Sequence, residues 1–124
     1  MSFNKILVAD DSLIVRKSVS KFLSESGYSA LVAASGEEAL QVLRDEEVHC
    51  LVLDLHMGSM TGFDVLEKMN AENLTTPVIV LTADLQEGSK TKAKGLGAAA
   101  FLTKPFNKQE FIDTLTNVEK SANV

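Results

Sequence analysis

Short apolar runs alternate along this chain with segments in which apolar residues recur at helical spacing. The runs consist mostly of β-branched and other large aliphatic residues between polar ones, and they cover residues 5–9, 30–33, 50–53, 78–81 and 101–103. Such runs are typical of strands buried in a parallel sheet. The spacing of the apolar residues between and after them predicts a helix following each strand.

Local signals mark where several of these helices begin. Ser12, Ser35 and Asn107 each stand where a helix N-cap is expected, and Asn107 is followed three residues later by a glutamate. These residue types satisfy the free amide groups of a first helical turn. The segment from about residue 84 to 96 predicts a weaker helix, because Gly88 and Gly95 lie inside it and each costs about 1 kcal/mol relative to alanine.

The strand–helix alternation is repeated five times, which is typical of right-handed βαβ units. We therefore predict an α/β fold, a three-layer sandwich with a doubly wound, five-stranded parallel sheet. The second run ends in Ala33, Ala34 and Ser35, with no chemically reactive group, which is typical of an edge strand. The first and third strands are then expected to flank the switch point of the sheet. Residues 1–124 are interpreted as a single domain with no output domain.

Composition limits the function classes. The 124 residues carry a net charge of -5, and nucleic-acid-binding domains are usually basic. No apolar run approaches the ~20 residues of a membrane-spanning helix. No signal peptide is visible, and the single cysteine, Cys50, lies in an apolar run and cannot form an internal disulfide. We therefore expect a cytoplasmic protein that binds neither nucleic acid nor membranes.

Polar side chains stand at the ends of four of the predicted strands. Asp10 and Asp11 follow the first, Asp54 the third, Thr82 the fourth and Lys104 the fifth. In parallel sheets, ligands bind outside the carboxyl ends of the strands, so these groups are expected to meet at one edge. Three neighbouring carboxylates repel one another unless a cation lies between them. The hard oxygen ligands that they supply predict Mg²⁺ as the cofactor.

A phosphoryl group at this edge would have Mg²⁺ on one side and Lys104 on the other. Asp54, at the tip of its strand, could then act as an oxygen nucleophile and form an aspartyl phosphate. Phosphoryl transfer depends mainly on positioning and charge stabilisation, so few further groups are required.

These residues resemble a known family, the receiver domain of two-component response regulators. The resemblance covers the whole chain and is carried by five separate signals in the right order: Asp10-Asp11, Asp54 with Met57, Met60 and Gly62, Thr82-Ala83, Phe101 to Thr103, and Lys104-Pro105-Phe106. It implies the flavodoxin-like strand order 2-1-3-4-5. It further implies that Asp54 is the phosphoacceptor, charged by a histidine kinase or a histidine phosphotransfer protein.

The resemblance also implies roles for the neighbours of Asp54. Asp11, Asp54 and the backbone carbonyl of His56 would bind Mg²⁺ directly, while Asp10 would act mostly through water. Lys104 would contact the phosphoryl group, and its bond to the following proline would be cis.

Two residues, Thr82 and Phe101, would form a switch. Thr82 would turn its hydroxyl onto the phosphoryl group and Phe101 would turn inward, which would repack the surface of the fourth helix, fifth strand and fifth helix. A downstream protein would bind there. Phe101 as a core aromatic is the alternative interpretation. Lys90, Lys92 and Lys94 are interpreted as a solvated helix face, and a basic patch that steers acidic segments of a partner onto this surface is the alternative.

The resemblance leaves the mode of action open. One mode is a stand-alone, chemotaxis-type regulator that binds a target when phosphorylated; the alternative is a phosphorelay intermediate or phosphate sink. Beyond its own phosphorylation and dephosphorylation, no enzymatic activity is expected. A Mg²⁺-dependent phosphohydrolase is disfavoured, because His56 occupies the position of its second aspartate. A monomer is expected, with a phosphorylation-dependent dimer as the alternative.

Overall fold

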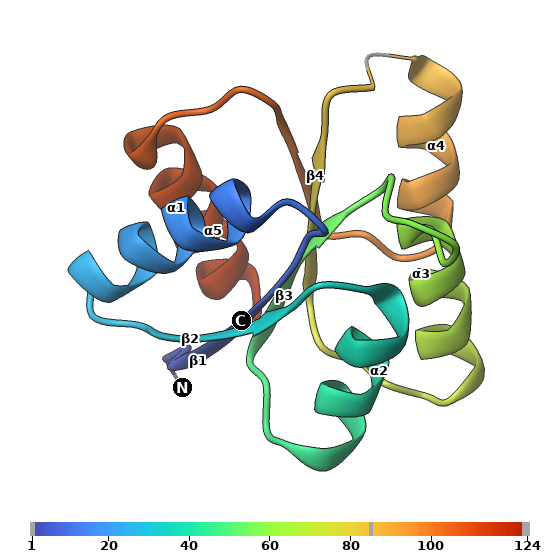
Figure 1. Ribbon diagram of the computed structural model, residues 1–124, viewed down its shortest axis with the longest axis horizontal. Coiled ribbons are helices and arrows are strands. Elements are labelled where there is room, and N and C mark those ends of the chain that lie inside the picture. The colour runs from blue at the N-terminus through green and yellow to red at the C-terminus, as the bar shows by residue number, and fades with distance from the viewer. Residues whose placement is uncertain (1, 85, 123–124) are drawn as a thin grey trace.

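The computed structural model describes residues 2–84 and 86–122 and shows one parallel sheet with helices on both faces (Figure 1). The strands lie in the order β2-β1-β3-β4-β5. They are β1 (Lys5–Ala9), β2 (Ser29–Ala33), β3 (Cys50–Asp54), β4 (Val78–Thr82) and β5 (Ala100–Thr103). The helices are α1 (Leu13–Glu25), α2 (Gly36–Asp45), α3 (Gly62–Ala71), α4 (Glu87–Gly95) and α5 (Lys108–Ala122). The predicted fold class is confirmed, and β2 is the edge strand that the sequence indicated.

The sheet separates two hydrophobic clusters. Figure 1 shows α1 and α5 on one face of the sheet and α2, α3 and α4 on the other. Alternate residues of the central strands supply both sides, so Leu7 belongs to the cluster under α2 and α3 and Val8 to the cluster under α1 and α5. The carboxyl ends of β1 and β3 are therefore fixed by packing on both faces. None of the helices in the described ranges has the length and apolar character needed to cross a membrane.

The predicted helix starts are confirmed. Ser12 accepts a hydrogen bond from the N–H of Val15, and Ser35 accepts one from Glu38. Asn107 and Glu110 bond to each other's backbone amides in a reciprocal capping box. The fourth helix begins at Glu87, later than the sequence indicated; Leu85, which lies within the predicted segment, is outside the described residues.

His49 has a structural role that the sequence did not indicate. Its Nδ1 accepts hydrogen bonds from the backbone N–H groups of Asn4 (2.9 Å) and Lys5 (3.0 Å), and its Nε2 lies 2.9 Å from Glu47 Oε1. His49 fixes the start of β1 at the sheet edge opposite the acidic residues.

Gly62 marks the closest approach of α3 to the end of β3. A Cβ atom at this position would lie 2.6 Å from the carbonyl oxygen of Asp54 and 2.8 Å from the Cα of Leu55. Because both are backbone atoms, neither can move aside without shifting the strand. We expect Gly62→Ala to lower the free energy of unfolding by about 3 kcal/mol in urea denaturation.

Gly88→Ala is the matched control for this substitution. A Cβ at Gly88 meets no atom of the described residues within 4 Å, and the position lies in α4. Alanine there should raise stability by about 0.5–1 kcal/mol, because it restricts the unfolded chain. Equal effects of the two substitutions would contradict the close approach at Gly62.

Candidate functional site

The three predicted carboxylates meet at the carboxyl edge of the sheet. Asp10 and Asp11 follow β1, and Asp54 ends the neighbouring strand β3. One carboxylate oxygen from each residue lies within 4.8 Å of the others. Asp10 is fully buried, Asp54 is almost fully buried and Asp11 is exposed. The cluster therefore opens to solvent on the side of Asp11.

Lys104 extends from the loop after β5 into this cluster. Its Nζ lies 2.8 Å from Asp10 Oδ2 and 3.6 Å from Asp54 Oδ2. Its backbone N–H donates to the carbonyl of Thr82 (2.8 Å), and its peptide bond to Pro105 is cis. The ammonium group thus bridges the two buried carboxylates, with the shorter contact to Asp10.

Two further contacts hold Asp10. Its Oδ1 accepts a hydrogen bond from the N–H of Ser12 (2.9 Å), and its backbone carbonyl accepts one from Arg16 Nη1 (2.8 Å). Sequence reasoning missed Arg16, which lies one turn into α1 and carries no motif that would have revealed this contact. With Lys104, these contacts compensate for the burial of Asp10.

The burial of the Asp54 carboxylate is compensated by fewer contacts than that of Asp10. Its Oδ1 accepts one backbone hydrogen bond, from His56 at 3.3 Å. Burial raises the pKa of Asp54 and the charge of Asp10 raises it further, while Lys104 and the His56 N–H act in the opposite direction. A cation at the cluster would stabilise the ionised carboxylate. The donor set, three carboxylates with hard oxygen atoms, fits Mg²⁺.

Thr82 and Phe101 lie on the neighbouring strands β4 and β5. Thr82 is fully buried, and its Oγ1 accepts a hydrogen bond from the N–H of Asp84 (2.9 Å). Phe101 is half-buried and packs against the cluster under α2 and α3. The strand register pairs Thr82 with Thr103, one residue before Lys104. The switch roles of Thr82 and Phe101 stay predictions.

The side chain of His56 lies at the outer side of the site. It is exposed, and its Nε2 lies 3.3 Å from Asp84 Oδ2. This contact joins the loop after β3 to the loop after β4. Metal binding by the His56 carbonyl stays a prediction. Met57 is buried at the base of the same loop, as expected of a packing residue.

Comparison with known proteins decides the family. The family model of the response regulator receiver domain matches residues 6–116. This chain belongs to that family. Receiver domains are signalling modules that take phosphoryl groups from histidine kinases or phosphotransfer proteins, and phosphorylation-dependent signalling is their general function.

Solved structures of receivers have the same fold. The chemotaxis protein CheY4 of Vibrio cholerae is 33% identical, with a TM-score of 0.89, over 94% of this receiver and 99% of that chain. The response regulator TrrA of Thermotoga maritima, solved in complex with Mg²⁺-BeF, is 27% identical, with a TM-score of 0.83, over 93% and 98% of the two chains.

Longer regulators contain a similar receiver. Response regulator RR06 of Streptococcus pneumoniae is 40% identical over 102 residues, which are 82% of this chain and 46% of that protein. The sensory/regulatory protein RpfC of Xanthomonas campestris is 31% identical over 121 residues, 94% of this chain and 17% of that protein. The chain thus spans less than half the length of these two relatives.

Proposed function

We propose that this receiver accepts a phosphoryl group on Asp54 and then signals by binding a target protein on the surface of α4, β5 and α5, as a chemotaxis-type regulator does. The observation that carries the first part is the position of Asp54. Its carboxylate lies at the open edge of the sheet, beside two other carboxylates and 3.6 Å from the Lys104 ammonium. The likeness to CheY4 supports the second part.

The proposed reaction is an in-line transfer from a phosphohistidine. An oxygen of Asp54 attacks phosphorus, the new O–P bond forms as the N–P bond breaks, and the imidazole nitrogen leaves with the electron pair. Among the described residues, the one backbone hydrogen bond to the Asp54 carboxylate is on Oδ1, and Oδ2 faces the Lys104 ammonium at 3.6 Å, so Oδ2 is the oxygen that we assign as nucleophile. Lys104 then stabilises the negative charge that the phosphoryl group brings.

Asp10, Asp11 and Asp54 would hold Mg²⁺, which supplies charge neutralisation for the phosphoryl oxygens when it is bound. Asp10 is already fixed by Lys104, Ser12 and Arg16, so its carboxylate is preorganised. Asp11 is exposed and carries its charge to the open side of the cluster. The acidic edge is therefore prepared for a cation before a phosphodonor arrives.

The phosphodonor requires a docking surface near Asp54, and an apolar hollow of about 460 Å³ lies beside the site. It is lined on one side by α1, including Ile14, and on the other by Ala83, Lys104, Pro105 and Phe106. Ile14 is 78% exposed beside this apolar hollow, and exposed apolar patches of this kind mark protein interaction sites. We assign this hollow to the protein that presents the phosphohistidine.

Ile14→Asp should separate donor docking from the chemistry. Burying an isoleucine side chain against a partner contributes to the free energy of binding. Loss of this contribution should slow phosphorylation by a histidine phosphotransfer protein about tenfold. Phosphorylation by acetyl phosphate, which needs no docking, should be unchanged. Val32→Asp is the matched control, because Val32 is also apolar and exposed but does not line the hollow. An equal loss of phosphorylation rate with the histidine phosphotransfer protein and with acetyl phosphate would contradict the assignment of the hollow to donor docking.

The proposed function is tested by intact-mass measurement after incubation with acetyl phosphate and Mg²⁺. One added phosphoryl group on Asp54 is expected, and its absence would contradict the proposal. A target affinity that rises on phosphorylation would support the chemotaxis-type mode. Rapid return of the phosphoryl group to a histidine phosphotransfer protein would support the relay or sink mode instead.

A further inference from the structure

The helix α4 has little support from the hydrophobic core. Ala93 is its one buried residue, and the side chain of its N-cap residue, Gln86, makes no capping hydrogen bond. Helices shorter than ~12–15 residues are marginally stable without tertiary contacts. The position of α4 therefore depends on the side-chain contacts made at its two ends.

At the N-terminal end, the carboxylate of Asp84 contacts the N-cap residue and the first turn of the helix. Its Oδ1 accepts the N–H of Gln86 (2.9 Å), and its Oδ2 accepts the Ser89 hydroxyl (2.6 Å). The Ser89 hydrogen bond is the main reason that the pKa of Asp84 lies below its usual range. A carboxylate at this end also interacts favourably with the helix dipole.

Asp84 also contacts the phosphorylation site. Its backbone N–H donates to Thr82 Oγ1 (2.9 Å), and its Oδ2 lies 3.3 Å from His56 Nε2. One residue therefore joins the buried hydroxyl on β4, the loop after Asp54 and the first turn of α4. No sequence motif for the family predicted this arrangement.

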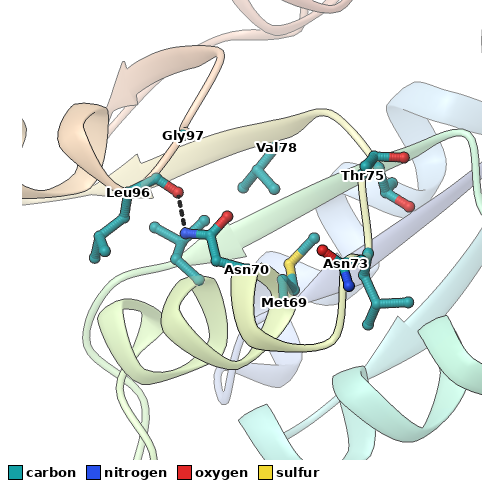
Figure 2. A pocket seen from close by; sticks show the side chains of 10 residues that line it. Met69, Asn70, Asn73, Thr75, Val78, Leu96 and Gly97 are labelled. Carbon is teal, nitrogen blue, oxygen red and sulfur yellow. Dashed lines mark hydrogen bonds between the residues drawn. The ribbon is translucent and has the colours of Figure 1, made fainter.

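The C-terminal end of α4 is held separately from the site. Figure 2 shows Asn70 of α3 beside Leu96, and its Nδ2 donates to the Leu96 carbonyl at 2.9 Å. A cavity of about 190 Å³ lies between this contact and the start of β4. The Lys92 ammonium lies 4.5 Å from the centroid of the Phe63 ring, which adds a cation–π contact between α4 and α3.

We infer that Asp84 is a positioning residue that latches the first turn of α4 to the unphosphorylated site, and that a phosphoryl group on Asp54 opens this latch while the Asn70 contact holds the other end. The inference rests on the proposed function. A phosphoryl group adds about -1.5 to -2 charges and strong acceptor oxygens. It would repel the Asp84 carboxylate and compete with it for His56. The start of α4 would then lose the contacts that Asp84 makes with Gln86 and Ser89.

The test is hydrogen exchange of the backbone amides of α4, measured with and without Mg²⁺ and beryllofluoride. The variants are Ser89→Ala, which removes one bond of the latch, and Thr91→Ala, which removes a hydroxyl elsewhere on α4. Ser89→Thr retains the hydroxyl and should restore wild-type behaviour. Fluorine NMR on the same samples reports whether beryllofluoride is bound at the site.

In the wild type, beryllofluoride should speed exchange in residues 87–90 more than in residues 93–96. Ser89→Ala should speed exchange in residues 87–90 about threefold without beryllofluoride, and the further increase on adding it should be smaller than in the wild type. Thr91→Ala should behave as the wild type does. Bound beryllofluoride with no change in α4 would overturn the latch, as would an equal response in Ser89→Ala and the wild type. No bound beryllofluoride in the wild type would instead contradict the proposed function.

Discussion

Replacing Asp54 by asparagine is expected to abolish phosphorylation by acetyl phosphate and by histidine donors, while the fold persists. The amide has nearly the same shape but lacks the nucleophilic carboxylate oxygen. Intact-mass measurement should show no stable phosphoryl adduct. A stable adduct on Asp54→Asn would show that another residue accepts the group.

The same substitution should make the metal-free protein more stable near neutral pH. Burial and Asp10 raise the pKa of Asp54, so ionising this carboxyl costs more in the folded than in the unfolded chain. The cost is present above the folded-state pKa, and it disappears as the pH falls below the unfolded-state pKa, where both states are protonated. The increase in the free energy of unfolding that Asp54→Asn causes, measured by urea denaturation, should therefore be largest at neutral pH and become smaller in acid. A gain that grows in acid would contradict this linkage.

Lys104→Met is expected to destabilise the metal-free protein by about 2–3 kcal/mol. Asp10 is fully buried, and its shortest cationic contact is the Lys104 ammonium at 2.8 Å. Breaking a buried ion pair costs about 3–5 kcal/mol, and the figure here is smaller because the Lys104 side chain is 23% exposed. Urea denaturation without divalent cations measures the effect.

A double-mutant cycle separates the ion pair from lost packing. In Asp10→Asn with Lys104→Met, Asp10 no longer carries a buried charge that has lost its ammonium partner, so the double variant should lose less stability than the sum of the two single losses. The control matters because Lys104 also carries an aliphatic chain, and the residue lines the apolar hollow beside α1. Additive losses would show that the two charges do not interact.

The sequence predicted most of what local chemistry determines. Ser12, Ser35 and Asn107 start helices because their side chains bond to amides within one turn. The gathering of Asp10, Asp11 and Asp54 followed from their places at the ends of parallel strands. Both inferences use spacing along the chain, and the alternation of strands and helices fixed which ends share an edge.

Contacts between distant side chains could not be predicted in this way. Lys104 was expected to contact a phosphoryl group. When no phosphoryl group is bound, the carboxylate that Lys104 contacts depends on how deeply Asp10 is buried, which the sequence does not give. His49 bonds to the backbone amides of Asn4 and Lys5, which lie 45 and 44 residues away in the chain at the start of β1. The link from Asp84 to Ser89 depends on where α4 begins, and element boundaries are the least reliable part of a prediction from sequence.

The elements of the fold differ in how much of each is buried in the core, and this difference determines which residues can be substituted. β3 is buried along its whole length, so substitutions there would disturb the nucleophile that it ends in. In α4, by contrast, Ala93 alone is buried, and its three lysines lie on a helix that contributes little to the core. Under the proposed function, substitutions on the exposed side of α4 should alter target recognition while the reactive edge stays intact, and libraries that randomise this side would be a practical starting point for rewiring a signalling pathway.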